Sequence, residues 1–217
     1  MRGYDLVVFD WDGTLVDSIS SIVGCTQRAL ADVGAPKVAD SAIRRTIGLG
    51  IREMVDSLVP GCDDALFERI CVAYREHWFS TFGARHQPFP GVGKLLTGLA
   101  KDGYLLSVAT AKSRRGLAED FERTGLGAHF HASRTVDESP AKPHPGMLES
   151  LIEEFGVRRQ RTVMIGDTAH DLEMAVNAGT AGIGVLGGSH GAEQLEAVAH
   201  QAILANACEL ADWLSGW

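Results

Sequence analysis

Asp10 directly follows a short apolar run at residues 6–9, and a second aspartate, Asp12, lies two residues further on. In extended backbone, residues two apart point their side chains to the same side. Two neighbouring carboxylates repel each other and raise each other's pKa unless a cation lies close by. With a divalent cation present, one carboxylate could attack phosphorus and form an aspartyl-phosphate, while the second transfers protons. The pair therefore indicates nucleophilic and acid–base chemistry at the end of a buried strand.

Complementary polar side chains occur farther along the chain. They are one hydroxyl, one ammonium group and two carboxylates: Thr110, Lys142, Asp167 and Asp171. Ligands of open parallel sheets bind at the carboxyl ends of the strands, so we expect the strand-end residues to converge there. Oxygen ligands favour Mg²⁺, and a hydroxyl and an ammonium group can hold phosphoryl oxygens and offset their charge. The set indicates phosphoryl transfer assisted by Mg²⁺.

Apolar runs and helical patterns alternate along most of the chain. The runs that read as strands are 6–9, 105–110, 162–166, 182–186 and 202–204. The helical patterns between them are 93–102, 113–125, 145–155 and 171–178. This alternation, with continuous apolar strands, is typical of a parallel sheet covered by helices on both faces. We therefore predict the α/β class, with a Rossmann-like parallel sheet as the core.

Residues 17–86 break this alternation. Their helical patterns are 22–33, 40–47, 51–58 and 64–79, and no clear strand pattern occurs among them. A segment of this length is the size of a small domain. The Pro-Phe-Pro-Gly segment at 88–91 then marks the return to the sheet. We predict an α-helical cap domain at 17–86, inserted after the first strand of a core made of 1–16 and 87–217.

Composition and charge disfavour some kinds of binding partner. The 217-residue chain has 20 basic and 28 acidic residues and a net charge of −8, which disfavours nucleic acid as a ligand. No apolar run approaches the ~20 residues of a membrane span, and the first residues do not resemble a signal peptide. The four cysteines form no CxxC pair, as fits a reducing compartment. We expect a cytoplasmic protein that acts on a small molecule, without nucleic-acid or membrane partners; its oligomeric state is left open.

Four segments resemble, in order, the motifs of the haloacid dehalogenase superfamily. They are Asp-Trp-Asp-Gly-Thr-Leu-Val-Asp-Ser at 10–18, Ser-Val-Ala-Thr at 107–110, Lys-Pro at 142–143 and Gly-Asp-Thr-Ala-His-Asp at 166–171. The segment at 88–92 resembles the usual return from cap to core in that superfamily. The resemblance covers nearly the whole chain and is strongest to bacterial phosphoglycolate phosphatase-like hydrolases with a helical cap after the first strand.

The resemblance implies catalytic roles for four residues. Asp10 would be the nucleophile. Asp12 would protonate the leaving group and then activate the hydrolytic water. Thr110 and Lys142 would hold the phosphoryl group.

The resemblance also implies a Mg²⁺ site. Asp10, the backbone carbonyl of Asp12, and Asp167 would be its ligands. Asp171 would either anchor the metal through a water molecule or steady Lys142.

Two cationic residues outside the motifs bear on the substrate. Arg52 follows the Gly-Leu-Gly segment 48–50 of the predicted cap, and an arginine suits bidentate binding of a substrate carboxylate. Lys112, just after the second motif, could also hold the substrate. The Gly-Gly-Ser-His-Gly turn at 187–191 differs from the Gly-Tyr turn common in the phosphoglycolate type, which leaves the identity of the substrate open.

The residues and the resemblance together predict a Mg²⁺-dependent phosphatase. It would hydrolyse a small phosphate monoester, similar to phosphoglycolate, through an aspartyl-phosphate intermediate. A phosphomutase of the β-phosphoglucomutase type would share this core, but it needs cap residues that recognise a sugar, and no decisive set of them occurs. A non-catalytic protein that binds a phosphate ligand on the same fold is the other alternative, although the charged residues of all four motifs are present.

Overall fold

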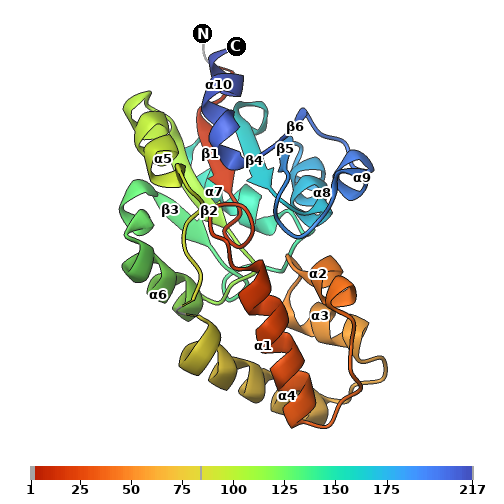
Figure 1. The fold of residues 1–217 in the computed structure, drawn as a ribbon. Coiled ribbons are helices and arrows are strands. Elements are labelled where there is room, and N and C mark those ends of the chain that lie inside the picture. The colour runs from red at the N-terminus through yellow and green to blue at the C-terminus, as the bar shows by residue number, and fades with distance from the viewer. Residues whose placement is uncertain (1–2, 84, 217) are drawn as a thin grey trace.

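The protein is built around one parallel sheet, as the sequence predicts. In the part of the chain that the computed structural model describes, residues 3–83 and 85–216, six strands pair in the order β3-β2-β1-β4-β5-β6 (Figure 1). Their bounds are β1 (Leu6–Phe9), β2 (Leu105–Ala109), β3 (Ala132–Arg134), β4 (Thr162–Gly166), β5 (Ala181–Val185) and β6 (Ala202–Leu204). The predicted α/β class is therefore confirmed.

The central strand β1 determines where the site lies. It pairs in parallel with β2 on one side and β4 on the other, with Phe9 in register with Val108 and with Ile165. The three strands therefore end at nearly the same height. The residues that follow them, Asp10, Thr110 and Asp167, are brought to one edge of the sheet. After β1 the chain adds β2 and β3 on one side of it and then β4, β5 and β6 on the other. Ligands of open parallel sheets usually bind at the strand where the order reverses in this way.

Strand β3 was not predicted from the sequence. It consists of Ala132–Arg134, and all three residues are only half-buried at the edge of the sheet. A strand that short, with an alanine, a serine and an arginine, has no continuous apolar run by which it could be recognised.

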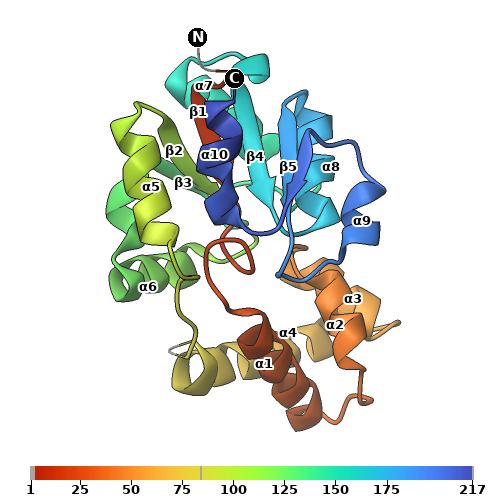
Figure 2. The ribbon, with the colours of Figure 1, turned by 45° about the horizontal axis from the view of Figure 1, so that its top comes forward.

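Helices cover both faces of the sheet. They are α5 (Val92–Lys101), α6 (Arg114–Thr124), α7 (Gly146–Phe155), α8 (Ala169–Ala178), α9 (Ala192–Glu196) and α10 (Leu210–Ser215), with short 3₁₀ segments η2 (Leu126–His129), η3 (Arg159–Arg161) and η4 (Ala207–Glu209). Val7 and Phe9 pack in the cluster that contains α5 and α10, and Leu6 and Val8 pack in the cluster with α7 and α8 (Figure 2). Alternating side chains of β1 thus bury against opposite layers.

The segment between β1 and α5 is helical and lies beyond the carboxyl ends of the strands (Figures 1 and 2). It forms α1 (Ile19–Asp32), α2 (Asp40–Thr46), α3 (Ile51–Leu58), α4 (Asp64–His77) and the π-helical turn η1 (Trp78–Phe82). These helices bury two apolar clusters of their own. Residues 1, 2, 84 and 217 of the predicted core and cap lie outside the described residues.

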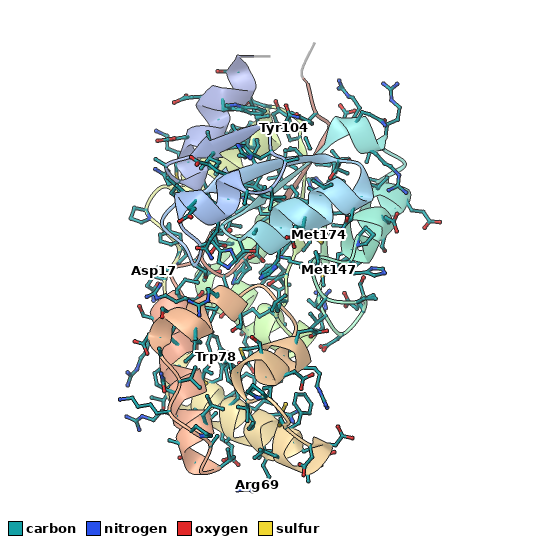
Figure 3. The ribbon with its side chains drawn as sticks, turned by 90° about the vertical axis from the view of Figure 1, so that its right-hand side faces the viewer. Asp17, Arg69, Trp78, Tyr104, Met147 and Met174 are labelled. Carbon is teal, nitrogen blue, oxygen red and sulfur yellow. The ribbon has the colours of Figure 1, made fainter. Side chains whose placement is uncertain are left out.

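The chain enters and leaves this helical cap through two adjacent segments. The backbone N–H of Asp17 donates to the carbonyl of Gln87, 2.9 Å away, and Val16 forms an antiparallel bridge with Pro88. Figure 3 shows Asp17 at the level where cap and core meet, between Trp78 of the cap and Met174 of the core. Among the described helices, none has both the length and the apolar character needed to span a membrane.

Candidate active site

Four buried ionic side chains meet at the carboxyl ends of β1 and β4. They are Asp10, Lys142, Asp167 and Asp171, each at most 3% exposed. Asp10 extends β1 by one residue, because its N–H donates to the carbonyl of Ile165 at 2.8 Å. Buried charges of this kind are stable only when they are paired or hold a metal. The structure therefore brings together four of the residues that the sequence singled out.

Lys142 lies between two of these carboxylates. Its Nζ is 2.7 Å from Asp10 Oδ1 and 2.6 Å from Asp171 Oδ1. Asp171 is fixed in turn at the start of α8, where its Oδ2 accepts from the N–H and the hydroxyl of Thr168. Burial lowers the pKa of Lys142, but Asp10 and Asp171 outweigh it and raise that pKa above the usual value. The contact between Asp171 and Lys142 is the one expected if Asp171 holds the Lys142 ammonium group in position.

Asp167 is held by the first motif and by the turn at 187–191. Its Oδ1 accepts from the Thr14 hydroxyl at 2.8 Å, and its Oδ2 accepts from the Ser189 N–H at 2.7 Å. A Cβ on Gly13, whose φ is +82°, or on Gly188 would collide with the Asp167 carboxylate. The glycines of the first motif and of the divergent turn therefore allow close packing around this acid.

Three of the acidic side chains are placed to hold a cation. One ligand oxygen each from Asp10, Asp167 and Asp171 lies within 4.8 Å of the others. Burial raises the pKa of Asp10 well above its usual range, with Lys142 opposing and the other two carboxylates adding to the rise. Burial, followed by Asp171, raises the pKa of Asp167 to about 7. Three buried carboxylates facing one ammonium group fit a hard divalent ion such as Mg²⁺.

The raised pKa of Asp167 predicts a pH-dependent stability for the metal-free protein. An aspartate with a folded pKa of about 7 binds its proton more tightly than in the unfolded chain, where the pKa is about 3.9. The stabilising contribution of Asp167 to the free energy of unfolding is therefore complete below about pH 4 and is lost as the pH rises through about 7. Between pH 5.5 and 8 in chelator, we expect the free energy of unfolding to fall by about 2 kcal/mol.

Denaturant unfolding at both pH values checks this expectation. The Asp167→Asn variant should lose the part of the difference that this carboxyl contributes, and saturating Mg²⁺ should reverse the difference for the wild type, because the ion favours the charged carboxylates. Metal-free protein that is equally stable at both pH values would contradict the raised pKa of Asp167.

Asp12 belongs to a second ionic group beside the first. Its Oδ1 accepts from the Ser18 hydroxyl at 2.6 Å and lies 2.9 Å from Lys112 Nζ. The same Nζ is 3.2 Å from Asp120 Oδ2 and lies over the ring of Trp78, 4.4 Å from its centroid. Burial lowers the pKa of Lys112, but Asp12 and Asp120 raise it above the usual value. Lys112 therefore stays charged and holds the Asp12 carboxylate in place.

Asp120 of α6 is a member of this group that sequence reasoning missed. It accepts from Trp11 Nε1 at 2.9 Å and from Arg123 at 2.9 Å, and it lies 3.0 Å from His86 Nε2. Burial raises the pKa of Asp120, but His86, Lys112 and Arg123 outweigh it and hold that pKa below its usual range. No motif marks Asp120, because all its partners except Arg123 lie outside its own helix.

We expect Asp120→Asn to destabilise the fold by about 3 kcal/mol, because it leaves several buried donors without their anionic partner. Thermal unfolding would measure this as a clear fall in Tm. The matched variant Arg123→Gln removes a donor whose side chain is 24% exposed, and it should cost less than about 1 kcal/mol. Equal losses in the two variants would contradict the central position of Asp120.

The structure does not bring Arg52 to this group. The Arg52 side chain is 44% exposed on α3, where it pairs with Asp56 at 3.1 Å and with Asp64 at 2.7 Å. Its guanidinium also covers the ring of Phe67, 4.7 Å from the centroid. The i, i+4 spacing to Asp56 favours such a surface ion pair.

The cap touches the core next to the acidic side chains. Gly48, in the loop between α2 and α3, lies so close to the Thr168 side chain that a Cβ would be 3.0 Å from its Oγ1. Buried His190 accepts from the Ala169 N–H, and its Nε2 is 3.4 Å from the carbonyl of Arg45. Beneath this contact, Asp10, Asp12 and Thr110 line a cavity of about 630 Å³ between cap and core.

Comparison with known proteins agrees with this geometry. The model of the family "Haloacid dehalogenase-like hydrolase" matches residues 7–185, so the chain belongs to that family. The chain is 38% identical over 207 residues to "Probable phosphatase IndB" of Dickeya dadantii, with 92% of this chain and 88% of that protein covered. It is 30% identical over 179 residues to "Phosphoglycolate phosphatase" of Mesorhizobium japonicum, with 80% and 79% covered.

A solved structure extends the comparison to the whole fold. The crystal structure of a putative haloacid dehalogenase-like hydrolase from Bacteroides fragilis superposes with a TM-score of 0.90 at 26% identity, and it covers 95% of this chain and 99% of its own. The chain is thus a haloacid dehalogenase-like hydrolase that resembles phosphatases of this family.

Proposed function

We propose that the protein is a Mg²⁺-dependent phosphatase that hydrolyses a phosphate monoester of a small molecule through an aspartyl-phosphate on Asp10. The observation that carries the proposal is the contact of Asp10 with Lys142 beside Asp167, with Asp12 two residues on and facing the same cavity. Likeness to proteins named phosphatase and phosphoglycolate phosphatase supports it.

The first chemical step would be attack by the Asp10 carboxylate on phosphorus, with departure of the alcohol oxygen. Asp12, held by Ser18 and Lys112, would donate a proton to that oxygen and then take one from the water that hydrolyses the aspartyl-phosphate. The fixed position of the Asp12 carboxylate would keep it in reach of both oxygens.

Two further side chains would hold the phosphoryl group. Thr110 Oγ1 accepts from the Lys112 N–H at 3.2 Å, so its own hydrogen is free to be donated to a phosphoryl oxygen. Lys142 would offset the negative charge from the other side, in an environment where burial strengthens electrostatic interactions.

The carboxylates of Asp10 and Asp167 and the backbone carbonyl of Asp12 would hold Mg²⁺. When bound, the ion would neutralise phosphoryl oxygens and reduce repulsion between them and the attacking carboxylate. Asp171 would act mainly on Lys142, since one of its oxygens contacts that ammonium group and the other caps α8.

Phosphate release from a panel of monoesters, with Mg²⁺ or with chelator, tests the proposal. The panel would include phosphoglycolate, sugar phosphates, nucleotides and simple alkyl phosphates. We expect Mg²⁺ to raise the rate of at least one of these by more than about 10²-fold, given the several kcal/mol that metal ions contribute to phosphoryl transfer. Release that is unchanged by chelator, or absent for every ester, would contradict the proposed activity.

A further inference from the structure

The cavity between cap and core is larger than a small acidic leaving group requires. Its volume of about 630 Å³ lies within the range of about 300–1,000 Å³ typical of sites for drug-sized ligands. The phosphoryl group would occupy the end formed by Asp10, Asp12 and Thr110. A two-carbon acid attached to it would leave most of the remaining volume unfilled.

One wall of the cavity is an apolar stripe on α4 and η1. Its members recur at intervals of three or four residues and so face one side of the helix: Phe67, Cys71, Tyr74 and Trp78. Tyr74 and Trp78 stack with an interplanar angle of 8°. This stripe points toward the cavity, whereas Val72 on the same helix is 49% exposed to solvent.

The opposite wall is also apolar. It comes from α3 and the loop that precedes it, and its members include Ile47, Leu49 and Met54. Both walls line the space into which the leaving group would extend from Asp10, and members of both also share the apolar clusters of the cap. Apolar walls on both sides favour an apolar occupant by removing its surface from water.

The polar side chains of the cavity are poorly suited to a sugar. The Thr46 hydroxyl donates to the carbonyl of Ile43 at 2.7 Å, and the Ser113 hydroxyl accepts from the Gly116 N–H at 3.2 Å. Each of these two hydroxyls keeps only one direction of hydrogen bonding for a ligand, and the remaining acidic side chains of the lining, Glu68 and Asp137, are exposed. A sugar would have to bury several hydroxyl groups against apolar walls, and each one left unpaired would weaken binding.

The cations of the cavity are equally unsuited to a carboxylate on the leaving group. Among the described residues they are Lys112, Arg75 and Arg115. Lys112 already contacts two carboxylates. Arg115 is 71% exposed and pairs with Glu119, and Arg75 is exposed with its Nε donated to the carbonyl of Cys71. No buried cation of the described lining is left to pair with a second anionic group.

Building on the proposed phosphatase activity, we infer that the substrate is a phosphate monoester of a bulky, mainly apolar alcohol with an aromatic ring. The phosphoryl group lies against Asp10, and the apolar body fills the space between the α4 stripe and the Leu49–Met54 wall. Because aromatic rings bury a large apolar area, an aryl body fits this space better than a sugar or a short acid.

The test compares alkyl phosphates whose leaving oxygens are chemically alike. Ethyl phosphate, 2-phenylethyl phosphate and 2-(naphthyl)ethyl phosphate differ in the apolar body and little in the reactivity of the ester. With Mg²⁺, we expect kcat/KM to rise by about 30-fold or more from the ethyl to the naphthylethyl ester, as burial of an aromatic side chain of that size implies. Phosphoglycolate and glucose 6-phosphate should be no better than ethyl phosphate.

A matched pair of variants locates the effect. Leu49→Trp fills part of the cavity and should lower kcat/KM about 10-fold more for the naphthylethyl ester than for ethyl phosphate. Val72→Trp makes a similar change on the exposed side of α4 and should leave both unchanged. If Leu49→Trp loses activity toward ethyl phosphate through misfolding, Ile51→Trp, also on the cavity wall, takes its place.

Calorimetric binding of the corresponding phosphonates, which are not hydrolysed, separates this inference from the proposed activity. Tighter binding of naphthylethylphosphonate than of ethylphosphonate, without turnover of any ester, would support the apolar site and refute the phosphatase. Turnover of ethyl phosphate and phosphoglycolate, with no gain for the aryl esters in rate or binding, would overturn the inference and leave the phosphatase intact.

Discussion

Asp10→Asn should abolish Mg²⁺-dependent phosphate release, with a fall in kcat of at least about 10⁴-fold, as loss of a covalent nucleophile implies. An amide cannot form the aspartyl-phosphate, although it has nearly the same size as the carboxylate. The substitution also removes one carboxylate from a buried group in which Asp167 and Asp171 already repel it. We therefore expect the variant to fold, with Lys142 still paired to Asp171 at 2.6 Å.

Phosphate release under single-turnover and steady-state conditions measures the effect, and circular dichroism checks the fold. Asp212→Asn, the same chemical change at an exposed position of α10, is the control and should leave the rate unchanged. Trapping of a phosphorylated protein in the wild type and its absence in Asp10→Asn would add direct evidence for the intermediate. Substantial residual turnover in a folded Asp10→Asn variant would contradict the role of Asp10 as the nucleophile.

The part of the site that lies at strand ends could be predicted from the sequence. Asp10 and Asp167 directly follow apolar runs, and parallel strands in register must bring such residues to one edge. The sequence predicts the meeting of Lys142 and Asp171 less directly, because both residues lie outside the strands. Their placement followed from the order of the motifs, and the structure shows the contact between them.

The residues that sequence reasoning missed owe their position to long-range contacts. Asp120 looks like one more acid on an amphipathic helix, yet it contacts Trp11 across 109 residues of sequence and His86 across 34. Arg52 is a sequence candidate for binding a substrate carboxylate, but it lies on the surface of α3, where it pairs with both Asp56 and Asp64. The sequence contains Asp56 at i+4, and that spacing was the available signal for a surface pair.

The cavity could not be predicted from the sequence either, although the sequence pattern of α4 predicts the apolar helix face that forms one of its walls. The spacing of Phe67, Cys71, Tyr74 and Trp78 predicts an apolar face, and apolar faces normally pack into a core. Only the arrangement of α4 opposite the α2–α3 loop, with the sheet below, leaves that face lining a cavity. Such space depends on how cap and core meet, which no local pattern encodes.

The charge balance of the site gives Lys142 two separate roles. In the metal-free protein it is the only cation of the described residues in direct contact with Asp10 and Asp171, and these contacts raise its pKa despite burial. In the loaded enzyme, the same ammonium group would offset charge on the phosphoryl oxygens. Removal of a buried partner leaves an uncompensated charge, which is far more costly than loss of an exposed ion pair.

Lys142→Met keeps most of the side-chain volume and deletes the charge, so both roles should fail together. We expect kcat to fall by about 10²–10³-fold. In chelator, the stability should fall by about 3–5 kcal/mol, or about 6–20 °C in Tm, and Mg²⁺ should restore part of it. Lys94→Met, at an exposed position on α5, should change neither quantity. Metal-free Lys142→Met protein as stable as the wild type would mean that the carboxylates do not depend on this cation, because they would then be held protonated by burial alone.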